Sequence, residues 1–186
     1  MSGFDAKTSK EDAGKRTATS KTFTNADGSS TVDYFAAPVN YTAADGSVQP
    51  IDPTLVAAPA TAPAAKSGSS ASSSAGSLAG SSAVAGTSAA GRLVRKAGDA
   101  SVSLAASGTD PALMTVGSGS ASLSFALSGA AAVPAATKGT QATYPSILPG
   151  VDLTLQATTT GVEQTLVLAS ASAATDYVFP YTVAGV

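Results

Sequence analysis

The strict alternation of apolar and polar residues between positions 151 and 168 constrains the fold of this chain more than any other feature. Large apolar residues occupy every second position of residues 151–156, and they return after the turn at residues 158–161. A period of two is that of a β-strand with one face buried. The segment therefore predicts an antiparallel hairpin. Its expected inward-facing residues are Val151, Leu153, Leu155, Val162, Leu166 and Leu168.

Shorter runs with the same period occur elsewhere in the chain. Residues 121–127 and 177–183 alternate, and two Asp-Gly turns, at Asp27 and at Asp45, separate short runs nearer the N-terminus. Glycine suits such turns because it adopts positive φ without a steric penalty. No segment has the 3.6-residue period of an amphipathic helix. We therefore expect an all-β chain, an antiparallel β-sandwich of roughly eight to ten strands, with a jellyroll-like arrangement or an open barrel as alternatives.

Composition divides the chain into four parts. Residues 1–20 contain several charged residues interspersed with small polar ones, and we expect them to form a disordered leader. Residues 21–56 supply the first β-hairpins of the core. Residues 57–91 are almost entirely Ala, Ser, Gly, Thr and Pro, and cannot bury enough apolar area to offset the entropy of ordering, so they are expected to be a low-complexity insertion or linker. Residues 92–186 complete the sandwich.

Two local features mark boundaries between the expected elements. Pro50 and Pro53 lie close together, and because proline cannot donate a ladder hydrogen bond, we expect this segment at a sheet edge or in a crossing loop. Arg92, Arg95 and Lys96 form a compact basic cluster directly after the low-complexity stretch. We interpret this cluster as a protease-sensitive boundary between the insertion and the core.

Composition also removes most chemistries from consideration. The 186 residues include no histidine, cysteine or tryptophan, and the formal net charge is −2. Serine or cysteine catalysis usually needs an imidazole base, zinc sites need thiolate or imidazole ligands, and nucleic-acid binding needs clustered Lys and Arg. We therefore expect no catalytic residue, no cofactor, no metal and no nucleic-acid partner. No stretch approaches the roughly 20 apolar residues of a membrane span, and the first residues do not resemble a secretion signal.

The acidic residues are interpreted as surface and turn residues. The carboxylates within or beside expected strands are Asp33, Asp52, Asp152 and Glu163. Acid and base catalysis needs two carboxyl groups in contrasting environments, whereas Asp152 and Glu163 fall on the outward face of the expected hairpin. Asp27 and Asp45 lack the dense ligand spacing of a calcium loop, and turn formation explains them.

Five tyrosines are the candidate contact residues of the chain. A tyrosine ring with its hydroxyl at the rim can stack on a sugar or pack against a protein partner. The candidates are Tyr34, Tyr41, Tyr144, Tyr177 and Tyr181.

Three stretches carry a family resemblance. Residues 20–29 read S-K-T-F-T-N-A-D-G-S, and residues 37–55 contain A-P-V-N-Y, D-G and Q-P-I-D-P-T-L. Residues 142–168 contain A-T-Y-P-S-I-L-P-G-V-D-L and G-V-E-Q-T-L-V-L. Together they resemble the N-terminal region of large secreted actinobacterial proteins that carry RHS (YD) repeats, DNRLRE domains or LamG-like domains. The chain departs from that pattern at Val48, where the family usually has Trp, and at Ala36, where Gly is common.

The resemblance implies an exported, cell-surface or wall-associated module that precedes repeats or a toxin, and it implies no catalytic residues. A signal peptide would then be absent from this chain. The expected function is that of a non-catalytic structural and interaction module whose partners are downstream domains of the same polypeptide. The alternative is a carbohydrate-binding or adhesin domain that uses the tyrosines to bind cell-wall glycan.

Overall fold

The structure, a computed structural model, describes residues 3–59 and 91–185 and confirms the all-β prediction. Within these ranges the strands form four antiparallel sheets, and the helical structure is one 3₁₀ turn, η1 (Ala13–Lys15). Most of the expected low-complexity insertion, residues 57–91, lies outside the described residues.

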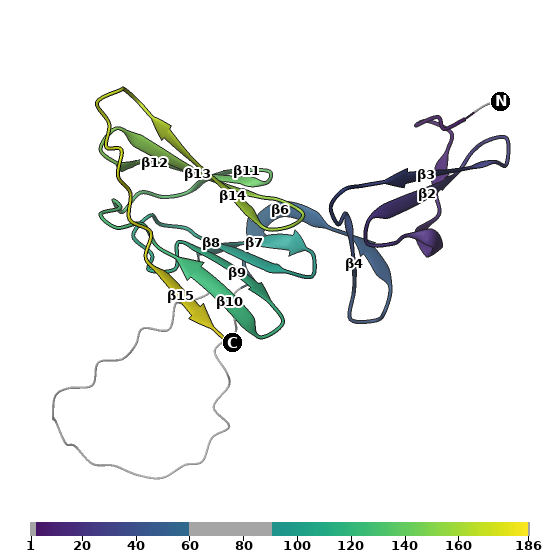
Figure 1. The fold of residues 1–186 in the computed structure, drawn as a ribbon, viewed down its shortest axis with the longest axis horizontal. Coiled ribbons are helices and arrows are strands. Elements are labelled where there is room, and N and C mark those ends of the chain that lie inside the picture. The colour runs from purple at the N-terminus through teal and green to yellow at the C-terminus, as the bar shows by residue number, and fades with distance from the viewer. Residues whose placement is uncertain (1–2, 60–90, 186) are drawn as a thin grey trace, which may run out of the picture.

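Two sheets pack face to face as a β-sandwich (Figure 1). The larger sheet has six strands in the order β15-β10-β9-β8-β7-β6. These are β6 (Asp52–Ala57), β7 (Arg92–Ala97), β8 (Ser101–Ala105), β9 (Met114–Ser118), β10 (Ala121–Phe125) and β15 (Tyr181–Ala184). The smaller sheet has four strands, β11 (Ala136–Lys138), β12 (Gln141–Leu148), β13 (Val151–Ala157) and β14 (Val162–Leu168). Neighbouring strands follow chain order, except that β15 returns from the smaller sheet to pair with β10.

The core lies between these two sheets. Alternate residues of β13 are buried from Val151 to Ala157, and Leu153 and Leu155 meet Leu104 of the opposite sheet in one apolar cluster. Each fully buried leucine contributes roughly 1.5–3 kcal/mol to stability. The predicted 151–168 hairpin is confirmed, with Leu153 opposite Leu166 in the register.

One residue of that hairpin departs from its expected position. Leu168 was expected to face inward, yet 43% of it is exposed. Because β14 is the outer strand of the smaller sheet, the end of this strand has a neighbour on one side only. The alternation of the sequence gives the face on which a side chain lies, whereas its burial also depends on what covers that face.

The N-terminal residues form two small sheets beside the sandwich (Figure 1). The three-stranded sheet contains β1 (Lys10–Glu11), β2 (Ser20–Thr24) and β3 (Ser30–Tyr34), and the two-stranded sheet contains β4 (Asn40–Thr42) and β5 (Val48–Pro50). We call residues 3–50 the N-terminal unit. The sequence placed residues 21–56 in the core, but the apolar core cluster includes no residue before Leu55. The N-terminal unit instead buries polar side chains, those of Ser20, Thr22, Asn25 and Asn40.

The structure also differs from the expectation of a disordered leader at residues 1–20. Strand β1 pairs with β2, and Arg16 contacts Glu11 at 2.6 Å. The rings of Phe4 and Phe23 meet edge to face, with centroids 4.9 Å apart. The hydrogen bond between Arg16 and Glu11 lowers the pKa of Glu11 and raises that of Arg16. Charged residues near the N-terminus, such as Glu11 and Arg16, therefore contact each other within the fold, which composition alone did not indicate.

The expected position of the proline segment is confirmed. Pro50 ends β5, and Pro53 lies in β6, which is an outer strand of the six-stranded sheet. The register between β6 and β7 shifts between Asp52 and Leu55, at the proline.

Candidate interaction site

The structure does not bring the five candidate tyrosines together. Tyr34 and Tyr41 lie on the N-terminal unit, where 82% of Tyr34 is exposed. Tyr177 and Tyr181 lie on the returning segment of the sandwich, and Tyr181 is 68% exposed. Tyr144 is fully buried in the core. No shared stacking platform is formed by the five rings.

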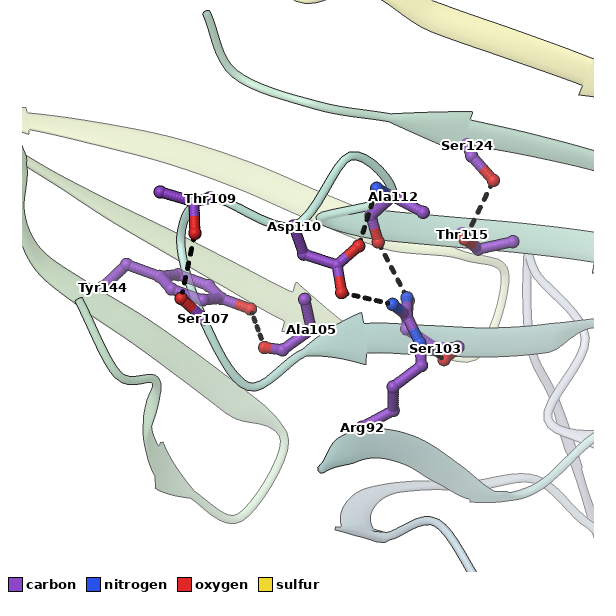
Figure 2. A network of polar contacts seen from close by, with 10 residues as sticks. All are labelled: Arg92, Ser103, Ala105, Ser107, Thr109, Asp110, Ala112, Thr115, Ser124 and Tyr144. Carbon is purple, nitrogen blue, oxygen red and sulfur yellow. Dashed lines mark hydrogen bonds and ion pairs between the residues drawn. The ribbon is translucent and has the colours of Figure 1, made fainter. Parts of the chain in front are cut away.

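Tyr144 has a structural role that the sequence did not reveal. Its hydroxyl donates a hydrogen bond of 2.6 Å to the carbonyl oxygen of Ala105, which belongs to the opposite sheet (Figure 2). Burial raises the pKa of the Tyr144 hydroxyl well above its usual value, so the group stays protonated and remains a donor. A buried tyrosine usually satisfies its hydroxyl in this way.

Arg95 makes a second polar connection between the sheets. It lies on the inner face of β7, with its side chain 1% exposed, and its Nη1 donates to the carbonyl oxygens of Thr158 and Thr159, both at 3.1 Å. These carbonyls belong to the turn that joins β13 and β14. A further bond joins Nη2 to the carbonyl of Ala100. Burial lowers the pKa of Arg95, and the charge of Asp99, 4.0 Å away and largely exposed, opposes that change.

Arg92 organises the loop that follows β8 (Figure 2). Its Nε donates to Ser103 Oγ at 2.6 Å, and its Nη1 contacts Asp110 Oδ2 at 3.2 Å. Its Nη2 donates to the carbonyl of Ala112 at 2.8 Å, while Asp110 Oδ1 accepts the N–H of Ala112. The guanidinium therefore holds residues 107–112 against β8.

These contacts show that two residues of the basic cluster, Arg92 and Arg95, bind within the fold, which their spacing in the sequence did not indicate. Arg92 and Arg95 lie in β7, which has a neighbour on each side in the larger sheet, and their guanidinium groups bind backbone carbonyls and a carboxylate. Lys96 is exposed, and its Nζ lies 2.9 Å from Asp52 of the neighbouring strand. Arg95 and Lys96 are adjacent in sequence but differ in environment, because successive side chains of a strand point to opposite faces of the sheet.

The candidate carboxylates also shape the backbone. Asp152 Oδ1 accepts the backbone N–H of Ser146 at 2.6 Å. Ser146 has a φ of 49° and lies where the register of β12 shifts between Tyr144 and Leu148. A positive φ is unfavourable for serine, so the bond to Asp152 helps to hold this bulge. Asp33 and Glu163 are exposed on outer strands.

The two Asp-Gly turns have the same structure. Asp27 Oδ1 accepts the N–H and the hydroxyl of Ser29, and Asp45 Oδ1 does the same with Ser47. The hydrogen bonds from the serine lower the pKa of each carboxyl group. This pairing supports turn formation, because the carboxylate oxygen is occupied by its own loop.

An apolar hollow of about 470 Å³ opens between the larger sheet and the β13–β14 turn. Its floor is the end of the β9–β10 hairpin and the adjacent β15, on the same face of the sheet as the core. The four-stranded sheet is too small to cover all six strands of its partner. We call this surface the β15 hollow. Its lining residues are Ala100, Val116, Gly117, Ser118, Ala121, Ser122, Leu123, Thr160 and Val183.

The β15 hollow has a mainly apolar lining. It contains no ionisable side chain, and its only reactive groups are the hydroxyls of Ser118, Ser122 and Thr160. Nucleophilic catalysis by a hydroxyl needs an adjacent base. The sequence predicted alternating strands at residues 121–127 and 177–183, which include Leu123 and Val183, but it gave no signal that one face of these strands is partly uncovered.

Within residues 3–59 and 91–185, no three acidic side chains are grouped so that they could hold a metal ion. The same part of the chain has no helix of the length and hydropathy needed to cross a membrane. Comparison of the chain with protein-family models, with curated proteins and with solved structures finds no match.

Proposed function

We propose that this chain is a non-catalytic structural and interaction module at the N-terminal side of an exported cell-surface or RHS-type toxin-delivery protein. The observation that carries the proposal is that polar side chains of the sandwich bind within the fold, whereas an apolar surface is left open to a partner. The buried polar groups of Tyr144 and Arg95 and the half-buried guanidinium of Arg92 bind other parts of the same fold, and the β15 hollow is left with an apolar lining.

The absence of a base from the hollow supports a non-catalytic role. A general acid or base must lie within hydrogen-bonding reach of the reacting group. The charged residue nearest in sequence to the lining is Asp99, next to Ala100, and 71% of its side chain is exposed to water. The chemistry that this surface offers is the removal of apolar area from water, which is the main source of affinity in protein association.

The proposed partner is a downstream domain of the same polypeptide, which would place apolar side chains in the β15 hollow. Export to the cell surface is supported by the resemblance of residues 20–29, 37–55 and 142–168 to the secreted proteins named above. The strongest of these stretches, residues 142–168, contains Tyr144 and Asp152, which stabilise the sandwich and its bulge. In this proposal the resemblance therefore reflects a shared scaffold.

The test is coprecipitation of the chain with the polypeptide that the gene encodes after residue 186. Ala121→Glu places a charge in the β15 hollow and is expected to abolish binding. Ala136→Glu adds the same charge at the exposed β11 strand and is expected to leave binding intact. Equal binding by both variants, or a gene that ends at codon 186, would contradict the proposal.

A carbohydrate-binding role is the second candidate, and the observation that favours it is the 82% exposure of Tyr34. An exposed ring can stack on a sugar face. Sedimentation with peptidoglycan tests it: binding that is lost in Tyr34→Ala and kept in Tyr177→Ala would favour this role over docking.

A further inference from the structure

The outer strand β15 differs from the other outer strands of the two sandwich sheets, which are β6, β11 and β14. Natural sheets protect their edges with charge, proline or very short strands, because an unprotected edge pairs with other chains. In those sheets, charged residues or proline occur in β6 (Asp52, Pro53), β11 (Lys138) and β14 (Glu163). Strand β15 consists of Tyr181, Thr182, Val183 and Ala184, with no charge.

The pairing edge is longer than β15 itself. Ala126 donates its N–H to the carbonyl of Pro180, and Ser128 donates to the carbonyl of Val178, so the chain runs beside β10 from residue 178 to residue 184. Along this stretch Val178, Tyr181 and Val183 are 65%, 68% and 47% exposed. The backbone groups of Pro180 face β10, so this proline removes no donor from the outer side, and the edge is extended, apolar and accessible.

The register with β10 shows which backbone groups are free to pair. In an antiparallel ladder the residues whose N–H and C=O bind the neighbouring strand alternate with residues whose groups point away. Because the carbonyl of Pro180 accepts the N–H of Ala126, the backbone N–H and C=O groups of Thr182 and Ala184 also point toward β10. The N–H and C=O of Tyr181 and Val183 point to the outer edge.

We propose that β15 pairs antiparallel with β15 of a second copy of this chain, about a two-fold axis at Thr182. This register places Tyr181 of each copy opposite Val183 of the other. Each such pair is then joined by two hydrogen bonds between outward-pointing backbone N–H and C=O groups. An aromatic ring opposite a β-branched side chain is a favourable cross-strand pair. The strand is complementary to itself, because it has no charge that two-fold pairing would bring against a like charge.

The pairing joins six strands of one copy to six of the other in one continuous sheet. The axis stands perpendicular to that sheet, so the two β15 hollows lie on the same side. Val183 belongs both to the paired edge and to the hollow. Self-association goes beyond the proposed function, and each can fail without the other.

Sedimentation velocity over a range of concentrations tests the association. The unaltered chain is expected to pass from monomer to dimer as its concentration rises. Thr182→Lys puts two like charges opposite each other at the axis and is expected to leave a monomer. Thr165→Lys makes the same change on β14, also exposed, and is expected to keep the dimer. A monomer at every concentration, or a dimer that persists in Thr182→Lys, would overturn the proposal.

Cysteine cross-linking tests the register, and the chain offers a clean background because it has no cysteine. In the proposed register the two Thr182 residues face each other as a non-hydrogen-bonded pair, whose spacing permits a disulfide. With oxidised glutathione as oxidant, Thr182→Cys is expected to give a covalent dimer. Tyr181→Cys, whose thiols lie on diagonal positions, and Thr165→Cys are expected to remain uncross-linked. Equal cross-linking of all three variants would overturn the register.

A monomeric Thr182→Lys variant also separates the two proposals. If it still coprecipitates with the downstream polypeptide, the proposed function stands whether or not the chain dimerises.

Discussion

The hydroxyl of Tyr144 and the carbonyl oxygen of Ala105 are joined by a 2.6 Å hydrogen bond that crosses the interior of the sandwich. Tyr144 lies in β12 of the smaller sheet and Ala105 at the end of β8 in the larger one. Apolar packing brings the two sheets together without fixing how they are aligned, whereas this bond specifies one alignment.

Tyr144→Phe is expected to lower the free energy of unfolding by about 1–3 kcal/mol, because it leaves a buried carbonyl without its donor. Urea denaturation followed by circular dichroism measures the change. Tyr34→Phe removes the same atom from an exposed ring and is expected to leave the midpoint unchanged. Equal stability of the two variants would show that the cross-sheet bond contributes nothing.

Arg95 and Gly98 are expected to be energetically coupled. A Cβ at Gly98 would lie 2.5 Å from Arg95 Nη2, and the glycine has a φ of 154°, so Gly98→Ala is unfavourable for the backbone and displaces the guanidinium. Loss of the bonds to Thr158 and Thr159 then adds to the cost. A double-mutant cycle of Gly98→Ala with Arg95→Met is expected to give a coupling of about 0.5–3 kcal/mol. Strict additivity would contradict the contact.

Asp52 gives the chain a pH-dependent contribution at the edge of the larger sheet. Hydrogen bonds from Thr54 and the ion pair with Lys96 lower the pKa of Asp52 from 3.8 to about 2. A carboxyl group with a lowered folded-state pKa stabilises the fold above its unfolded value, and this stabilisation is lost as the pH falls from about 4 toward 2. Asp52→Asn is expected to flatten the melting-temperature profile in that window, whereas Asp33→Asn is expected to leave it unchanged.

The sequence was most informative where burial follows from local period. In β13 the alternation of apolar and polar residues matches the alternation of buried and half-buried positions, because this strand has a neighbour on each side and a sheet above it. In β14 the same alternation predicted the correct partners, but Leu168 remains exposed. Which strands lie at an edge depends on pairings between distant segments.

Arg95 shows the limit of composition. Its position two residues after Leu93 indicates the inner face, yet its charge suggested the surface. The carbonyls that accept its hydrogen bonds, at Thr158 and Thr159, are more than sixty residues away in sequence. The β15 hollow could not be predicted for a similar reason, since it results from the mismatch between a six-stranded and a four-stranded sheet.

The N-terminal unit is expected to unfold separately from the sandwich, and Asn40 provides the test. Its Nδ2 donates to the carbonyls of Thr17 and Ser20 at 2.7 and 3.0 Å, which ties the β4–β5 hairpin to the three-stranded sheet. Asn40 is 1% exposed, so Asn40→Ala leaves two carbonyls without this donor and is expected to cost about 1–3 kcal/mol.

Because the apolar core includes no residue before Leu55, that cost should fall on the N-terminal unit alone. Hydrogen exchange of Asn40→Ala is expected to show faster exchange across β2 to β5 and unchanged protection in β13. Asn25→Ala, which removes bonds to Ser29 and Thr31 within one hairpin, serves as the matched control and is expected to affect β2 and β3 more than β4 and β5. Faster exchange in β13 of the Asn40 variant would mean that the two parts unfold as one cooperative unit.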